Sequence, residues 1–143
     1  MHGITNIIIH CTATSPDQII TMDMITDCHG VRWCNDFFYH YVISQQGDIF
    51  SGWDERIKSP FFEDFPDYSL HIAYIGGKSS VTQLPIDTRT RKQKDAILSL
   101  IIDICVRHNI QNITGHRDWQ SVSCPSFDAA KEYYDYIPAN RSY

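Results

Sequence analysis

The chain has 143 residues, of which 43% are hydrophobic and 20% are charged, so it suits one globular domain and is not a disordered chain. Acidic residues outnumber basic ones by 17 to 12, and the net charge of −5 disfavours a protein that binds duplex nucleic acid through a basic face. The longest apolar runs, Ile7–Ile9 and Leu98–Ile102, are far shorter than the roughly 20 residues of a membrane-spanning helix.

The N-terminus and the cysteines indicate where the chain is made. Met1–Asn6 has no basic stretch and no long apolar segment, which predicts that there is no signal peptide. The five cysteines are an odd number and include no Cys-x-x-Cys pair, as expected for free thiols in a reducing compartment. We therefore expect synthesis in the cytoplasm.

The first two thirds of the chain alternate between β-prone runs and loop signals. The three isoleucines within Asn6–Cys11 are typical of a strand that is buried on both faces. Aromatic and β-branched residues on either side of Gly47 predict a hairpin. In chain order, the predicted elements are a strand at Asn6–Cys11, a short helix at Ile19–Cys28, strands at Phe37–Ser44, Ile49–Trp53 and Leu70–Ile75, and loops at Asp54–Asp67 and Lys78–Asp87.

The last third predicts two helices and one strand. Apolar residues recur at helical spacing over Arg91–His108, and Thr90 is suited to cap this helix. Asn112–Gly115 is a short strand, and Pro125 suits the first turn of a last helix. That helix would bury one face, made of Ala130, Tyr133, Tyr134 and Ile137. Together the elements predict a single mixed α/β domain over residues 1–143, with a central sheet of about five strands flanked by about three helices.

Three residues that commonly bind metals follow predicted strands. His10 ends the first strand, His116 follows the strand Asn112–Gly115, and Cys124 lies eight residues after His116. Two imidazoles and one thiolate are a ligand set typical of catalytic zinc, in which the fourth position is left for water. The spacing alone also occurs by chance, and Cys124 could equally be a small buried hydrophobe.

Four motifs, taken together, resemble one protein family. Ile7–Thr14 looks like the opening motif of the zinc-dependent N-acetylmuramoyl-L-alanine amidases of the small phage-lysozyme type, which are related to peptidoglycan recognition proteins. Phe38–Ile43 with Gly47–Ile49 is similar to the hairpin of that family, and Ser69–Gly77 is similar to one of its strands. Its C-terminal motif is matched by Gly115–Asp118 followed by Cys124–Asp128. The motifs occur in the family's order over about residues 6 to 136.

The resemblance implies that His10, His116 and Cys124 bind Zn²⁺ and that Tyr39 is the catalytic tyrosine. It implies hydrolysis of the amide bond between N-acetylmuramic acid and L-alanine in peptidoglycan, without a nucleic-acid partner. It also implies a monomeric enzyme similar to an endolysin, which reaches the cell wall through a pore or a secretion system. The alternative is a peptidoglycan-recognition module that has the same fold and binds without cutting.

The chain departs from the family's pattern in the residue two positions before the ligand cysteine. The family usually has a lysine or threonine there, which contacts the tetrahedral intermediate, whereas this chain has Val122. A valine has no hydrogen-bond donor, so the contact is missing or comes from Ser121, Ser123 or Arg117. Ser123 is the nearest in sequence and is a predicted substrate contact.

Two further departures concern the substrate-facing surface. His71 stands where the family has glycine, and it is predicted either to reach the cleft as a substrate contact or to cover the sheet. The histidine that the family has in the loop after the hairpin is absent around Lys58–Pro60. Trp119 is a further predicted substrate contact, because aromatic faces pack well on sugar rings, although such residues more often belong to a core.

Overall fold

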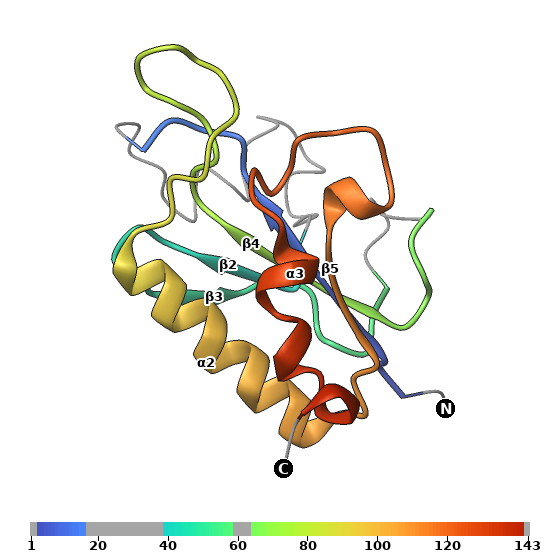
Figure 1. The fold of residues 1–143 in the computed structure, drawn as a ribbon. Coiled ribbons are helices and arrows are strands. Elements are labelled where there is room, and N and C mark those ends of the chain that lie inside the picture. The colour runs from blue at the N-terminus through green and yellow to red at the C-terminus, as the bar shows by residue number, and fades with distance from the viewer. Residues whose placement is uncertain (1–2, 17–38, 59–63, 142–143) are drawn as a thin grey trace, which may run out of the picture.

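The computed structural model describes residues 3–16, 39–58 and 64–141, and in these ranges five strands form one sheet (Figure 1). The strands are β1 (Asn6–Cys11), β2 (Tyr41–Ile43), β3 (Ile49–Ser51), β4 (Ser69–Tyr74) and β5 (Asn112–Gly115). Their order is β3-β2-β4-β1-β5, with β3 antiparallel to β2 and all other pairs parallel. The predicted mixed sheet is confirmed, whereas the helix predicted at Ile19–Cys28 lies outside the described residues.

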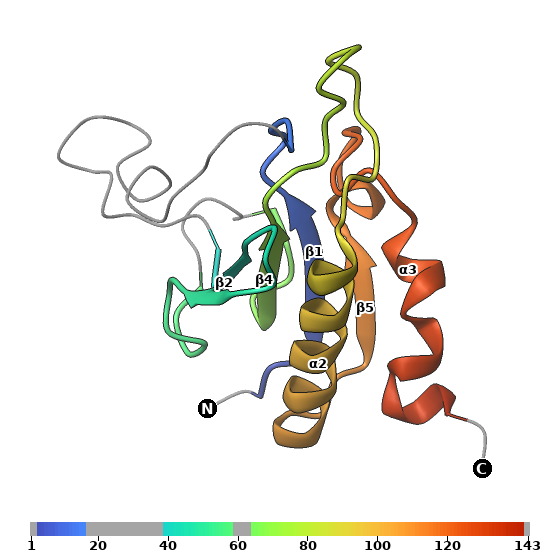
Figure 2. The ribbon, with the colours of Figure 1, turned by 90° about the vertical axis from the view of Figure 1, so that its left-hand side faces the viewer.

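The two faces of the sheet have different partners because side chains alternate along each strand. Ile7 and Ile9 of β1 lie in the main core, whose helical side is formed by α2 (Arg91–Arg107) and α3 (Ala129–Glu132). Figures 1 and 2 show both helices on this one face of the sheet. Every residue of β1 and β4 is buried, so both faces of these two strands are covered.

Helix α2 supplies much of the core and begins where the sequence predicts. Thr90 and Gln93 form a capping box, in which each side chain accepts a hydrogen bond from the other residue's backbone N–H at 3.1 and 2.9 Å. Four apolar side chains of α2 are buried, and each contributes about 1.5–3 kcal/mol through burial. They are Ile97, Leu100, Ile101 and Ile104. No helix in the described ranges is long and apolar enough to cross a membrane.

The C-terminal segment differs from the prediction. Helix α3 begins at Ala129 rather than at Pro125, because Asp128 caps it by accepting the N–H of Lys131 and Ser126 has a positive φ of 71°. Beyond Glu132 the chain continues as two 3₁₀ turns, Tyr134–Tyr136 and Pro138–Asn140. The buried positions are Ala129, Tyr133 and Ile137, whereas Tyr134, which was predicted to be buried, is 56% exposed.

Arg89 joins the loop before α2 to this C-terminal segment. Its guanidinium donates two hydrogen bonds to Asp87, two to Glu132 and one to the hydroxyl of Tyr133, all between 2.7 and 3.0 Å. The same group lies 3.4 Å from the ring centroid of Phe127. Only 2% of the Arg89 side chain is exposed, so these contacts hold a buried charge.

Candidate metal centre and active-site cleft

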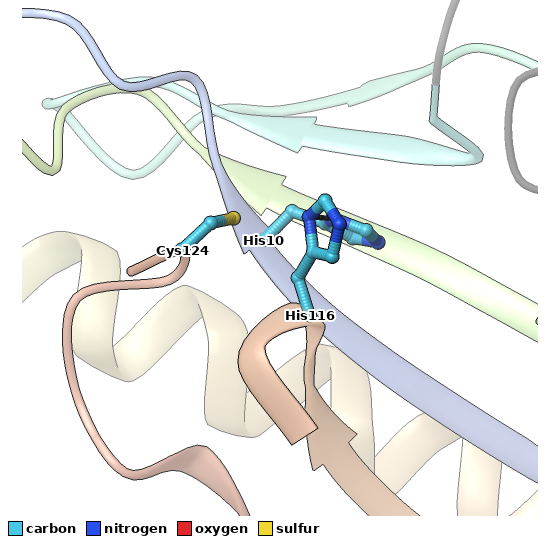
Figure 3. A group of neighbouring side chains, drawn as sticks. All are labelled: His10, His116 and Cys124. Carbon is cyan, nitrogen blue, oxygen red and sulfur yellow. Dashed lines mark hydrogen bonds between the residues drawn. The ribbon is translucent and has the colours of Figure 1, made fainter. Parts of the chain in front are cut away.

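The fold brings His10, His116 and Cys124 together although they are far apart in the sequence. Strands β1 and β5 are parallel neighbours, with Ile9 paired with Gly115, so the residues that follow meet at one edge of the sheet. The loop after His116 returns to the same place because the backbone N–H of Arg117 donates to the carbonyl of Cys124 at 2.8 Å. Figure 3 shows the two imidazole rings side by side, with the sulfur of Cys124 on the same side of the sheet edge.

Gly115 allows this close approach. A Cβ at this position would lie 2.8 Å from Cδ of Pro125, the residue next to Cys124. A side chain at position 115 would therefore push the segment that carries Cys124 away from the two histidines. Pro125 is also held by the hydroxyl of Tyr74, which donates to its carbonyl at 2.6 Å.

The ligand atoms have a geometry that suits zinc. Nδ1 of His10 and Nδ1 of His116 are 3.3 Å apart, and the three ligand atoms all lie within 4.8 Å of one another. Two nitrogens that bind one tetrahedral zinc ion at about 2.05 Å lie about 3.3 Å from each other. The Sγ atom of Cys124 accepts the backbone N–H of Cys11 at 3.1 Å, a contact that stabilises a thiolate. Among the described residues, this is the group that could hold a metal.

The protonation states of His10 and Cys124 determine whether these side chains can bind a metal ion. Burial, together with the nearby histidines His71, His116 and His40, lowers the pKa of His10 well below 6.5. The ring of His10 is therefore neutral and keeps a lone pair for a cation. A hydrogen bond with the side chain of Cys11, together with burial, raises the pKa of the Cys124 thiol and outweighs the opposite effect of the Cys11 backbone N–H. A metal that binds here would have to displace the thiol proton, so its binding would release a proton.

A cavity of about 540 Å³ opens beside this group. Tyr39 lines it together with His116 and Cys124, and its ring centroid is 5.2 Å from that of His10. Ser123 also lines the cavity, as does the exposed Val122. The complete lining is Cys11, Thr12, Ala13, Tyr39, Gly77, Lys78, Gln83, Pro85, His116, Val122, Ser123, Cys124 and Ser126. We call this cavity the active-site cleft.

Two of the predicted substrate contacts lie outside the lining of the cleft. Trp119 is 42% exposed and lines a neighbouring depression that shares Val122 and Ser123 with the cleft, while its Nε1–H donates to Thr114. His71 is 1% exposed and lies beneath the metal centre, where its Nδ1 is 2.8 Å from Nε2 of His10. Burial in β4 keeps His71 from the surface, so its position does not support direct contact with substrate.

Sequence reasoning missed three residues around the metal centre. Phe65, in the segment predicted as loop, is buried with its ring centroid 5.3 Å from that of His116 and 6.0 Å from that of His10. The Oε1 atom of Gln120 lies 2.8 Å from Nε2 of His116, a contact that the i, i+4 spacing could have suggested. Lys78 brings a positive charge to the lining of the cleft, and the Gly76–Gly77 pair that ends the preceding strand was the available signal.

The comparisons with known proteins agree with this geometry. The family model of N-acetylmuramoyl-L-alanine amidases matches residues 2–127. The chain therefore belongs to the N-acetylmuramoyl-L-alanine amidase family. As a member it is an enzyme that hydrolyses the amide bond between N-acetylmuramic acid and L-alanine in peptidoglycan.

The individual relatives described next are between 19% and 25% identical to this chain. An endolysin of Enterobacteria phage T3 and one of Escherichia phage T7 are each 25% identical over 122 residues, which are 85% of this chain and 80% of the relative. The amidase LysC from Clostridium intestinale has a TM-score of 0.75 at 20% identity and covers 96% of this chain and 86% of its own. Human PGRP-IBETAC, solved in complex with glycosamyl muramyl pentapeptide, has a TM-score of 0.69 at 19% identity over 93% of this chain and 83% of its own. LysC and PGRP-IBETAC therefore have the same fold as this chain.

Proposed function

We propose that this amidase is zinc-dependent and that His10, His116 and Cys124 hold the ion. The observation that carries the proposal is the convergence of these three side chains, with ligand atoms within 4.8 Å, at the wall of the active-site cleft. Two imidazoles and a thiolate leave one position of a tetrahedral zinc ion open, as in catalytic sites. A zinc ion there supplies an activated water and polarises the carbonyl of the scissile amide.

Tyr39 lines the cleft and is the proposed source of a catalytic hydroxyl. Its ring lies beside His10, and its backbone is fixed because its carbonyl accepts the N–H of Trp53 at 3.2 Å. The phenol either donates a hydrogen bond to the oxyanion that develops on the amide carbonyl or holds the attacking water. Both roles need the hydroxyl and neither needs the metal ligands to move.

The cleft offers two donors in place of the missing lysine or threonine. Ser123 lies beside Val122 and lines the cleft, whereas Arg117 and Ser121 line only the neighbouring depression. Lys78 is the one lysine or arginine among the lining residues, and its side chain makes no ion pair within the described parts of the chain. We propose that Ser123 and Lys78 face the carbonyl oxygen. Losing one such donor costs about 10²–10³ in rate.

The biological role that fits best is that of an endolysin. The phage relatives are endolysins, and they match this chain over most of its length. We propose that the enzyme acts as a monomer, reaches the cell wall after release through a pore or a secretion system, and binds the glycan with the help of Trp119. Its substrate is the muropeptide of peptidoglycan.

Digestion of purified peptidoglycan tests the proposal. The protein should contain about one zinc ion and should release stem peptides that begin with L-alanine, as mass spectrometry and N-terminal labelling detect. A chelator should abolish the release, and added Zn²⁺ should restore it. His116→Ala should lose both zinc and activity, while His108→Ala, whose ring contacts Glu55 away from the cleft, should keep both. Tight binding of muropeptides without release would favour the recognition module instead.

A further inference from the structure

Each histidine of the metal centre has a partner at the ring nitrogen that points away from the centre. Nε2 of His116 lies 2.8 Å from Oε1 of Gln120, and Nε2 of His10 lies 2.8 Å from Nδ1 of His71. The two Nδ1 atoms face each other at 3.3 Å. The Gln120 oxygen can only accept, so His116 donates from Nε2 and has its lone pair on Nδ1. The contact of His10 is different, because His71 could either donate or accept.

The direction of the hydrogen bond between His10 and His71 decides whether His10 can bind a metal through Nδ1. The two nitrogens are 2.8 Å apart, which is hydrogen-bond distance, so one ring donates an N–H and the other accepts it with a lone pair. If the neutral ring of His10 donates from Nε2, the lone pair is on Nδ1, the atom that faces Nδ1 of His116. If His71 donated instead, the proton of His10 would sit on Nδ1 and block that atom.

The surroundings of His71 hold its ring in place. Its backbone N–H donates to Nδ1 of His40 at 3.0 Å, and its carbonyl accepts the N–H of His40 at 2.9 Å. The rings of His40 and His71 are stacked, with centroids 5.7 Å apart and an interplanar angle of 12°. His40 is itself fixed, since its Nε2 donates to the carbonyl of Ile57 at 2.7 Å. Phe65 packs edge-on against His71 with a centroid separation of 5.4 Å.

Burial makes this partner hard to replace. His10 and His71 are each 1% exposed, so a water molecule has little room to take the place of the His71 ring. Gln120 lies at the exposed surface, where water can accept the proton of His116 when the amide is removed. The His10–His71 and His116–Gln120 contacts are both 2.8 Å long, but water can replace only the partner of His116 easily.

We propose that His71 is a positioning residue that accepts a hydrogen bond from Nε2 of His10 and thereby holds the Nδ1 lone pair of His10 toward the metal. The proposal rests on the proposed zinc site and adds to it His71, a buried residue of β4. Partners of this kind fix the tautomer and the orientation of a metal-ligating histidine, and their loss typically weakens metal binding by about 10–100-fold.

Zinc affinity measured by competition with a chromophoric chelator tests the proposal. His71→Leu removes the acceptor at similar volume and should weaken zinc binding by about 10–100-fold. His71→Asn keeps an acceptor, because Oδ1 is as many bonds from the backbone as Nδ1 of histidine, and it should bind zinc nearly as tightly as the parent. Gln120→Leu is the matched control at the exposed partner and should also stay near the parent. Thermal unfolding of the zinc-free variants reports folding separately.

The tautomer of His10 can be observed without any metal. In a long-range ¹H–¹⁵N correlation spectrum of the zinc-free protein, His10 should show a protonated Nε2 in the parent and in His71→Asn, and a shift toward protonated Nδ1 in His71→Leu. A protonated Nδ1 in the parent, or equal zinc affinity in His71→Leu and Gln120→Leu, would overturn the proposal. Failure of the parent to bind zinc at all would instead refute the proposed zinc-dependent function.

Discussion

Replacing Arg89 by methionine should destabilise the fold, because it removes the charge that joins the loop before α2 to the C-terminal segment. Methionine keeps the length of the aliphatic part and can still pack on Phe127. The five hydrogen bonds to Asp87, Glu132 and Tyr133 are lost. The variant therefore separates the charged contacts from the packing.

The magnitude follows from the burial of the partners. Breaking a buried ion pair by removing one member typically costs about 3–5 kcal/mol. The side chain of Asp87 is 29% exposed and that of Glu132 is 43% exposed, so both carboxylates regain water once Arg89 is gone. Tyr133, which is 3% exposed, loses its partner with less access to water. We therefore expect the lower end, about 3 kcal/mol, which corresponds to a fall in Tm of about 6–12 °C.

Urea and thermal unfolding followed by circular dichroism measure this cost, with Arg91→Met as the matched control. Arg91 also forms an ion pair, with Asp95 at 3.2 Å, but its side chain is 86% exposed. Pairs of that kind contribute about 0.3–0.5 kcal/mol. If Arg89→Met lowers the free energy of unfolding by no more than Arg91→Met does, the assignment of a structural role to the buried charge is wrong.

Three further outcomes are expected. Hydrogen bonds from Arg107 lower the pKa of Glu55 from 4.5 to about 2, so the stabilisation from Glu55 is present above pH 4.5 and is lost as the pH falls toward 2. As the pH is lowered from 4.5 toward 2, the Tm of Glu55→Gln should therefore fall less than the Tm of the parent. Parallel curves of Tm against pH for the two proteins would contradict this. Tyr39→Phe should lower kcat by about 10²–10³ with zinc content unchanged, and an unchanged kcat would remove Tyr39 from the chemistry. Cys124→Ser should retain no zinc after dialysis because a serine hydroxyl is a poor zinc ligand, and retention of one equivalent by metal analysis would argue against Cys124 as a ligand.

The sheet and α2 could be predicted because their signals are local. The isoleucine run of β1 and the helical periodicity between Thr90 and Arg107 each report the burial of a whole element. The last helix was predicted to begin too early because the positive φ of Ser126 goes together with a tertiary contact, the hydrogen bond from Ser126 Oγ to the carbonyl of Gly77 at 3.0 Å. The cap at Asp128, which accepts the N–H of Lys131, is a local signal that sequence reasoning overlooked.

The candidate site was only partly predictable for the same reason. His10, His116 and Cys124 could be proposed from the sequence because they lie in recognisable motifs, and the structure brings them together. The surface role proposed for His71 could not be judged from sequence, since alternation along β4 places its side chain on one face without saying what covers that face. Phe65 was missed because no periodicity marks a single aromatic residue in a loop, even though its ring contacts three histidines.

The position of β1 between β4 and β5 has a consequence for how the enzyme matures. His10 is synthesised before the other two proposed ligands, because His116 and Cys124 follow it by 106 and 114 residues along the chain. Contacts of such long range form late, after the entropy of closing a long loop has been overcome. The proposed zinc site would thus be complete only when β5 has docked beside β1, and a chain cut short before residue 116 would contain one ligand and no site. Bound metal would then report a finished fold rather than guide the early steps of folding.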